Sequence, residues 1–459
     1  MGNALLTPTG QVAILGLIFL FIFTAYMTIQ GFASQLYGPE LGSNMASTLY
    51  ATFTVACFFA PSVTNKLGSR LTLFLGALGY AALVLASLIY SVVQAPWCKP
   101  IVVLGGGILG VGAALLWTAQ GRIMLELSDG SDQGKLFSIF WALFNCSAVV
   151  GGLLTYFYFS HNSEAAPWPL YLVFLGCIIV GGAACGILAP PHKVVRGQQR
   201  ATTEIAPVAR PGDIVVNAQE APDASAAAAT ESWDVEAIAT LRLFFTRRMA
   251  FLAPLFWYTG FNQPYQLNTF GNRFFDARAL GLELASFYFA EVLGAFLAGW
   301  MLDREANARV GAIRQLLIFS VATAAAYALA LMRELPAAEA NWPHCNVTRL
   351  AIDDPAILTP SAAFFLWGFC DSQIQAYCYW LIRQLYSDGS ELARAVAFFK
   401  MVQSLGWSVG FVLVPSSRLA PLVQNVLTVA SAVVGAALAL FELPTAKAGR
   451  SQPLLEEGS

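Results

Sequence analysis

The sequence predicts an all-α polytopic membrane protein with 12 transmembrane helices in two pseudo-symmetric six-helix bundles. Three observations lead to this fold class: the composition, the lengths of the apolar runs, and a repeat within the chain. Of the 459 residues, 57% are hydrophobic and only 11% are charged, whereas a soluble protein has roughly 25% charged residues. A water-soluble fold would expose apolar surface everywhere, which excludes that class.

Apolar runs of about 17 to 25 residues are long enough to cross the hydrocarbon core as helices. In the first half of the chain six such runs span residues 11–34, 46–64, 72–94, 101–121, 136–158 and 169–189. In the second half six more span residues 250–270, 284–302, 314–332, 361–382, 395–415 and 422–443.

These runs divide the chain into two bundles, a linker and a tail. We predict an N-terminal bundle over residues 1–189, a C-terminal bundle over 250–443, and a tail over 444–459. The middle of the linker, 190–249, is rich in Ala, Pro, Thr and polar residues. It has too little apolar content for a core, so we predict a largely disordered linker.

Basic residues predict the orientation. If the N-terminus lies inside, the inside segments hold 18 of the 25 Lys and Arg residues, and the outside loops hold 6. Because basic residues accumulate in cytoplasmic loops, both termini and the linker are expected in the cytoplasm. Which membrane holds the protein stays open.

The two halves share short matches at a constant offset of 259 residues. The sequence Ser-Asp-Gly-Ser follows both the fourth and the tenth runs, at 128–131 and 387–390. At the same offset Lys135 corresponds to Arg394, and Phe140 corresponds to Phe399. This placement indicates a duplication of a six-helix unit.

A second pair of segments lies between corresponding runs of the two halves. The first runs from Asn65 to Arg70, and the second ends on Asp303 and Arg304. They resemble the two copies of the cytoplasmic loop motif of the major facilitator superfamily, Gly-x-x-x-Asp-Arg. The first copy is degraded, because Asn65 stands where the motif has Asp and no Gly precedes it at the motif's spacing. We interpret these residues as gating loops; ordinary basic loop charge is the alternative.

Three ionisable residues lie inside predicted spans of the second half: Glu291, Asp371 and Lys400. A charge at this depth costs several kcal/mol, so it normally faces a cavity or a partner. Asp371 and Gln375 share one helix face. An ion pair between Asp371 and Lys400 is one hypothesis; the alternative is that Lys400 snorkels to the interface while Asp371 only joins helices. Glu291 is either a working carboxylate or a buried packing group.

The seventh run ends in a cluster of amides around Pro264, which we expect to break or kink the helix. Such a segment suits a gate or a binding site, although amides that merely pair between helices are the alternative. The candidate cavity residues of this segment, together with one on the first run, are Asn262, Gln263, Gln266, Asn268 and Gln30.

Three stretches have a distinctive sequence: 112–121, 253–280 and 367–407, with Gly368-Phe369-x-Asp371 and Phe398-Phe399-Lys400-x-x-Gln403 in the last. They resemble the Unc-93-like branch of the major facilitator superfamily, and look closest to its fungal, plant and protist members. The resemblance implies a fold in which the first, fourth, seventh and tenth helices line a central cavity. It also implies a role in potassium-channel regulation, receptor escort or potassium homeostasis, but no established substrate.

Two functions stay open at this point. One is transport of a small solute or ion by alternating access; the other is a non-transporting regulator of an ion channel or a trafficking partner of another membrane protein. No nucleophile, metal cluster or cofactor motif indicates an enzyme, and we expect no metal and no cofactor. A net charge of −2 argues against nucleic acid as a partner, leaving the lipid bilayer. Asn346, in the sequon Asn-Val-Thr, is the expected glycosylation site.

Overall fold

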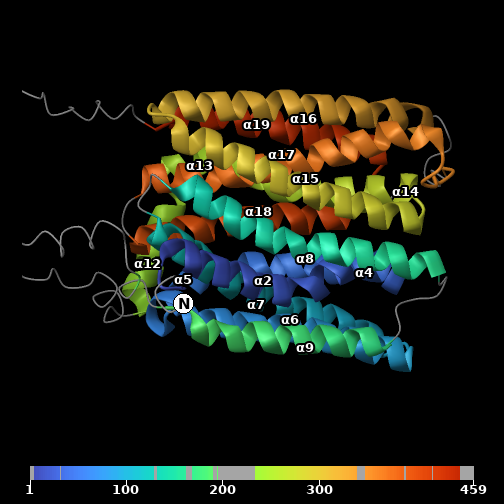
Figure 1. The fold of residues 1–459 in the computed structure, drawn as a ribbon, viewed down its shortest axis with the longest axis horizontal. Helices are drawn as coiled ribbons and strands as arrows, with labels where there is room; N and C mark the ends of the chain where they lie inside the picture. The colour runs from blue at the N-terminus through green and yellow to red at the C-terminus, as the bar shows by residue number, and fades with distance from the viewer. Residues whose placement is uncertain are drawn as a thin grey trace, which may run out of the picture.

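The computed structural model describes residues 5–31, 33–128, 132–161, 168–189, 194, 233–338, 347–386, 389–415 and 417–444. Within them, long helices run along one common axis, with the first half of the chain on one side and the second half on the other (Figure 1). The predicted all-α fold with two six-helix halves is confirmed.

The first half consists of six spans, of which the second is built from two helices. The bounds are α2 (Pro8–Gly31), α4 (Pro39–Ala56) with α5 (Ala60–Leu67), α6 (Ser69–Val93), α7 (Cys98–Leu127), α8 (Gln133–His161) and α9 (Trp168–Ala184). Two short helices join them, α3 (Ala33–Tyr37) and η1 (Cys185–Ile187).

The second half repeats this plan. Its helices are α13 (Arg247–Gln263) with the π-helix η3 (Pro264–Gly271), α15 (Ala277–Arg304), α16 (Ala308–Ala338), α17 (Leu358–Leu385), α18 (Gly389–Leu413) and α19 (Pro421–Ala439). Three short helices join or extend them, α14 (Asn272–Phe274), η4 (Pro355–Ile357) and η5 (Leu440–Glu442). Each predicted span falls on one of these helices or on a joined pair.

Length and hydropathy support a membrane fold. In the described part of the chain, 9 helices are long and apolar enough to cross a membrane, and the bent pair α4–α5 raises the number to 10. The two other predicted spans lie on α13, which has only 17 residues before the π-helix, and on the more polar α17.

The second span is longer than the apolar run 46–64 and consists of two helices. It begins at Pro39 and bends by 61° between α4 and α5. Pro61 lies in the first turn of α5. Helix α4 cannot continue straight through this position, because proline lacks an N–H and its ring clashes with the carbonyl four residues earlier.

Of the two expected effects of Pro264, a break or a kink, the break does not occur. The backbone stays helical at Pro264 (φ −54°, ψ −42°), and the α-helix changes there into a π-helix. Short π segments are frequent at functional sites.

The C-terminal end of the predicted linker is helical. Helix α12 (Trp233–Phe244) lies at the end of the molecule where α5 packs against α18, which we call the linker end (Figure 1). The middle of the predicted linker lies outside the described residues, as do Cys345, Asn346 and the tail from residue 445.

Small residues bring the two halves into backbone contact. A Cβ atom on Gly134 of α8 would lie 2.6 Å from the Cα of Gly299 on α15, so only glycine fits at this crossing. Ser138 of α8 donates a hydrogen bond to the carbonyl of Ala295 at 2.9 Å. Close approach through small residues is the usual way in which membrane helices pack.

Candidate functional site

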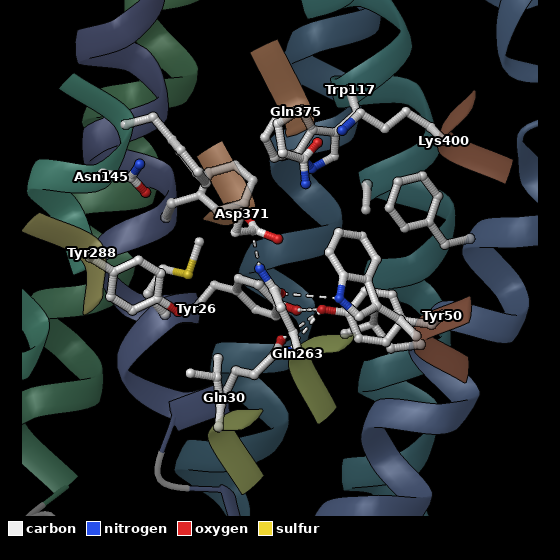
Figure 2. Close-up of a pocket in the computed structure, with 18 of the residues that line it drawn as sticks. Tyr26, Gln30, Tyr50, Trp117, Asn145, Gln263, Tyr288, Asp371, Gln375 and Lys400 are labelled. Carbon is white, nitrogen blue, oxygen red and sulfur yellow. Dashed lines mark hydrogen bonds between the residues drawn. The ribbon is translucent and has the colours of Figure 1, made fainter. Parts of the chain in front are cut away.

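A cavity of about 60 Å³ lies between the two halves, near the middle of the spans. Helices α2, α4, α7 and α8 contribute one wall, and the π-helix with α13, α15, α17 and α18 contributes the other. Figure 2 shows its polar side chains converging on a central space. Its labelled residues are Tyr26, Gln30, Tyr50, Trp117, Asn145, Gln263, Tyr288, Asp371, Gln375 and Lys400.

Asp371 lies in the middle of α17, and its carboxylate is held by amides of the seventh span. Asn262 Nδ2 donates to Oδ1 and Gln263 Nε2 donates to Oδ2, each at 3.2 Å. Trp407 Nε1 in turn donates to Gln263 Oε1 at 3.0 Å, which orients that amide. The side chain is buried, so these donors replace the water that would otherwise solvate the charge.

Lys400 lies well inside α18. Helix α18 begins at Gly389, so Lys400 lies about 16 Å along it, at about 1.5 Å per residue. Its Nζ is 4.5 Å from the ring centre of Trp117 and 4.7 Å from that of Phe399. It donates to Gln403 Oε1 at 2.8 Å. The snorkelling interpretation is therefore wrong, because a side chain that is 2% exposed does not reach the interface.

The hypothesised ion pair is also absent. Among the ion pairs within the described residues, none joins Asp371 to Lys400. Each charge has its own neutral partners instead, amides for Asp371 and aromatic rings with one amide for Lys400. The two groups face the same cavity separately, as Figure 2 shows.

Glu291, in the middle of α15, links the two halves. Its Oε2 accepts hydrogen bonds from Trp141 Nε1 and Asn145 Nδ2 of α8, both at 2.9 Å. The side chain also lines the cavity. Glu291 thus combines the two roles that the sequence left as alternatives, a packing contact and a cavity carboxylate.

The remaining predicted cavity residues divide into two groups. Gln375, Gln263 and Gln30 line the cavity. Gln30 Nε2 donates to the Tyr50 hydroxyl at 2.8 Å, and that hydroxyl lies 2.7 Å from the Tyr26 hydroxyl. Asn262, Gln266 and Asn268 are buried but outside the cavity; Gln266 Nε2 bonds to Tyr327 of α16 at 2.9 Å.

Sequence reasoning missed Tyr50, Asn145 and Tyr288 as cavity residues. Asn145 offered a signal, because it is a lone amide within an apolar run. Tyr50 and Tyr288 offered none, since a tyrosine in a membrane helix is equally suited to an interface.

Contacts between the halves close the cavity toward the far end, opposite the linker end. Ser43 of α4 donates to the carbonyl of Phe411 on α18 at 2.5 Å, and Ser408 donates to the carbonyl of Ser47 at 3.0 Å. Arg418 pairs with Glu40 at 3.2 Å.

The second loop motif closes the linker end. Asp303 accepts hydrogen bonds from the backbone N–H groups of Gly134 and Lys135, both at 2.8 Å, where α8 begins. An acid at a helix N-terminus is favoured by the unpaired N–H groups there. Arg304 lies over the ring of Trp300, and Arg70 is exposed on the first turn of α6.

A family model described as "Ion channel regulatory protein UNC-93" matches residues 39–441. This match covers most of the chain and both halves of the cavity. The chain belongs to the UNC-93 family. It has the major facilitator fold and is an integral multi-pass membrane protein, as the resemblance implied.

Similar proteins come from distant organisms. An UNC93-like protein of Schizosaccharomyces pombe is 26% identical over 82% of this chain and 70% of its own length. UNC93-like protein 1 of Arabidopsis thaliana is 25% identical over 92% and 86%. The UNC93-like protein MFSD11 of Xenopus tropicalis is 26% identical over 87% and 88%.

A solved structure shares the fold. The major facilitator superfamily proton:xylose symporter XylE, bound to 6-bromo-6-deoxy-D-glucose, covers 96% of this chain and of itself with a TM-score of 0.61. The two sequences are 14% identical, so the similarity extends to the fold alone.

Proposed function

We propose that this UNC-93 family protein carries a small solute or ion across the membrane by alternating access of its two halves, with Asp371 as the main binding group. The observation that carries the proposal is the cavity between the halves, near the middle of the spans, which Asp371, Glu291 and Lys400 line. Ionisable groups at this depth mark ion or substrate pathways in membrane proteins.

The cavity chemistry favours a small cation. Two carboxyl groups face one amine, and the buried carbonyl oxygens of Gln375 and Asn145 have no hydrogen-bond donor within the described structure. Carboxylate and amide oxygens are suitable ligands for an alkali cation or a hydronium ion. A volume of about 60 Å³ holds a few waters or one ion, far below the roughly 300 Å³ of pockets for larger ligands.

The proposal includes an orientation. Both termini, the linker and the linker end face the cytoplasm, because inside segments would hold 18 of the 25 basic residues. Residues 1–189 and 250–443 then act as the two moving units, joined by residues 190–249 and followed by the tail.

A second candidate function is a non-transporting regulator of an ion channel or a trafficking partner of another membrane protein. The description of the matching family model favours it. The dense aromatic lining around Lys400, with Trp117 and Phe399, also suits a fold that is held closed.

Uptake into liposomes that contain the purified protein distinguishes a transporter from a non-transporting regulator. Radioactive rubidium, a pH-sensitive dye and radioactive glucose serve as probes of cation, proton and sugar movement. Transport of a small cation predicts uptake of rubidium or protons above that of empty liposomes, and none of glucose. A regulator predicts no uptake of any probe by protein that remains folded.

A further inference from the structure

Helix α12 contacts both halves of the protein at the linker end. Its Glu236 accepts a hydrogen bond from Asn65 Nδ2 of α5 at 2.9 Å. The same carboxylate accepts from Arg394 of α18, through Nε at 3.0 Å and Nη2 at 2.5 Å. Phe244 repeats the pattern with apolar contacts, packing 5.3 Å from the ring of Phe58 and 5.1 Å from that of Phe398.

The pseudo-symmetry of the two halves allows the contacts of Glu236 to be compared with those of Asp303. In the second loop motif Asp303 binds the start of α8 at Gly134 and Lys135. Arg394, on α18, is the residue 259 positions after Lys135. In the first motif the acid is replaced by Asn65, whose neutral amide can accept a hydrogen bond but cannot form an ion pair with Arg394. The carboxylate that Arg394 binds comes from α12 instead.

Asn65 is itself fixed within the first half. Arg122 of α7 donates from Nη1 to Asn65 Oδ1 at 2.7 Å, while its Nε binds Glu126 at 2.7 Å. The amide therefore has its oxygen turned to Arg122 and its nitrogen turned to Glu236. The resulting hydrogen-bonded network crosses from the first half to the second through Arg122, Asn65, Glu236 and Arg394.

The ion pair at the centre of this hydrogen-bonded network is shielded from solvent. The side chain of Glu236 is 3% exposed and that of Arg394 is 12% exposed. A bidentate, charge-assisted contact in such surroundings is stronger and more directional than a surface ion pair. Removing one partner leaves the other charge buried without compensation.

We propose that Glu236 replaces the missing acid of the first loop motif, and that α12 is a clasp holding the linker end of the two halves together. Because α12 continues directly into α13 of the second half, opening this end requires Glu236 and Phe244 to leave Asn65 and Phe58. Glu236 is thus a positioning residue for the closed state. The inference does not depend on which solute the cavity binds.

Moving the carboxylate between positions 236 and 65 tests this role. Glu236→Gln removes the charge that Arg394 binds, and Asn65→Asp places a second carboxylate against Glu236; both should open the linker end. In the combined Glu236→Gln/Asn65→Asp protein the acid lies where the loop motif normally has it, facing Arg122. A glutamine at 236 can donate to this acid and accept from Arg394, so closure should return.

The readout is the distance between spin labels on cysteines placed at Leu71 and Val310, which are exposed near the starts of α6 and α16. Cys146 and Cys345 are replaced by serine in all proteins. We expect each single substitution to raise the ratio of long to short distances about tenfold, as for loss of a hydrogen bond between charged groups. The combined protein should return to the original distribution.

Glu442→Gln is the matched control, because Glu442 pairs with Arg248 at 3.4 Å within the second half alone; its distances should not change. If Glu236→Gln is not recovered as monodisperse protein, Arg394→Lys is measured in its place, since lysine keeps the charge but loses the bidentate contact. Unchanged distances in the single variants, or a combined variant as open as either of them, would overturn the proposal.

Discussion

At the residue scale, the three mid-membrane ionisable side chains differ in which parts of the protein hold them. Asp371 is bound by Asn262 and Gln263, which belong to its own half. Glu291 is bound by two donors of the other half. The contacts of Asp371 can therefore persist when the halves move. The hydrogen bonds of Glu291 to α8 persist only if the Glu291 side chain moves with α8, and break otherwise. This difference suits Asp371 to ligand binding and Glu291 to stabilising the closed state.

Glu291 provides a stability prediction. Glu291→Ala leaves the buried N–H groups of Trp141 and Asn145 without an acceptor, and should lower the free energy of unfolding by about 2–4 kcal/mol. Glu291→Gln keeps one carbonyl oxygen in place and should cost clearly less. Thermal unfolding in detergent measures both; equal melting temperatures for the two variants would show that the hydrogen bonds to α8 contribute little.

How much of the site was predictable depends on what each residue type requires. A buried charge is costly in any fold, so Asp371, Glu291 and Lys400 stand out from the sequence. Which neighbour satisfies each charge depends on helix rotation and packing, which hydropathy does not specify. For this reason the sequence suggested an ion pair for Asp371 and Lys400 and placed Gln266 in the cavity.

At the element scale, α13 and α18 are held together at the cavity by glycines. A Cβ atom on Gly260 would overlap the carbonyl oxygen of Gln403, the residue that binds Lys400. On the other helix, a Cβ on Gly406 would lie 2.6 Å from the carbonyl oxygen of Trp257. The positions of Gln403 and Lys400 therefore depend on this backbone contact.

Gly260→Ala should force the two helices apart and lower the free energy of unfolding by about 1–3 kcal/mol, the usual cost of overpacking. Gly176→Ala on α9 is the matched control, because nothing lies within 4 Å of a Cβ there; it should be neutral or slightly stabilising. Thermal unfolding of the two variants provides the comparison. A Gly260→Ala protein as stable as the control would contradict the close contact between α13 and α18.

The existence of the helices was predictable, but their irregularities were less so. Apolar length is a local property, so every predicted span falls on a helix. The bend before Pro61 and the π-helix from Pro264 depend on how neighbouring helices satisfy the backbone. Helix α12 was missed because its apolar residues adjoin a long polar stretch, and Glu236 becomes informative only when Arg394 lies beside it.

At the scale of the whole molecule, the orientation has a direct test at Asn346. With the linker inside, the loop that carries Asn346 lies outside and should be glycosylated. Glycosidase treatment should then increase the gel mobility of the protein, and Asn346→Gln should abolish that change. An epitope tag inserted between residues 200 and 230 should be reachable only after the cells are permeabilised. A tag accessible on intact cells would reverse the proposed orientation.

If a cation binds in the cavity between the halves at Asp371, rubidium uptake into proteoliposomes depends on that carboxylate. Asp371→Asn keeps the size of the side chain and an oxygen for Asn262, but removes the charge that would bind a cation. Asp353→Asn, at an exposed position, is the control. We predict that Asp371→Asn protein with a normal melting temperature reduces uptake to that of empty liposomes, while Asp353→Asn leaves it unchanged. Full uptake by folded Asp371→Asn protein would contradict the account.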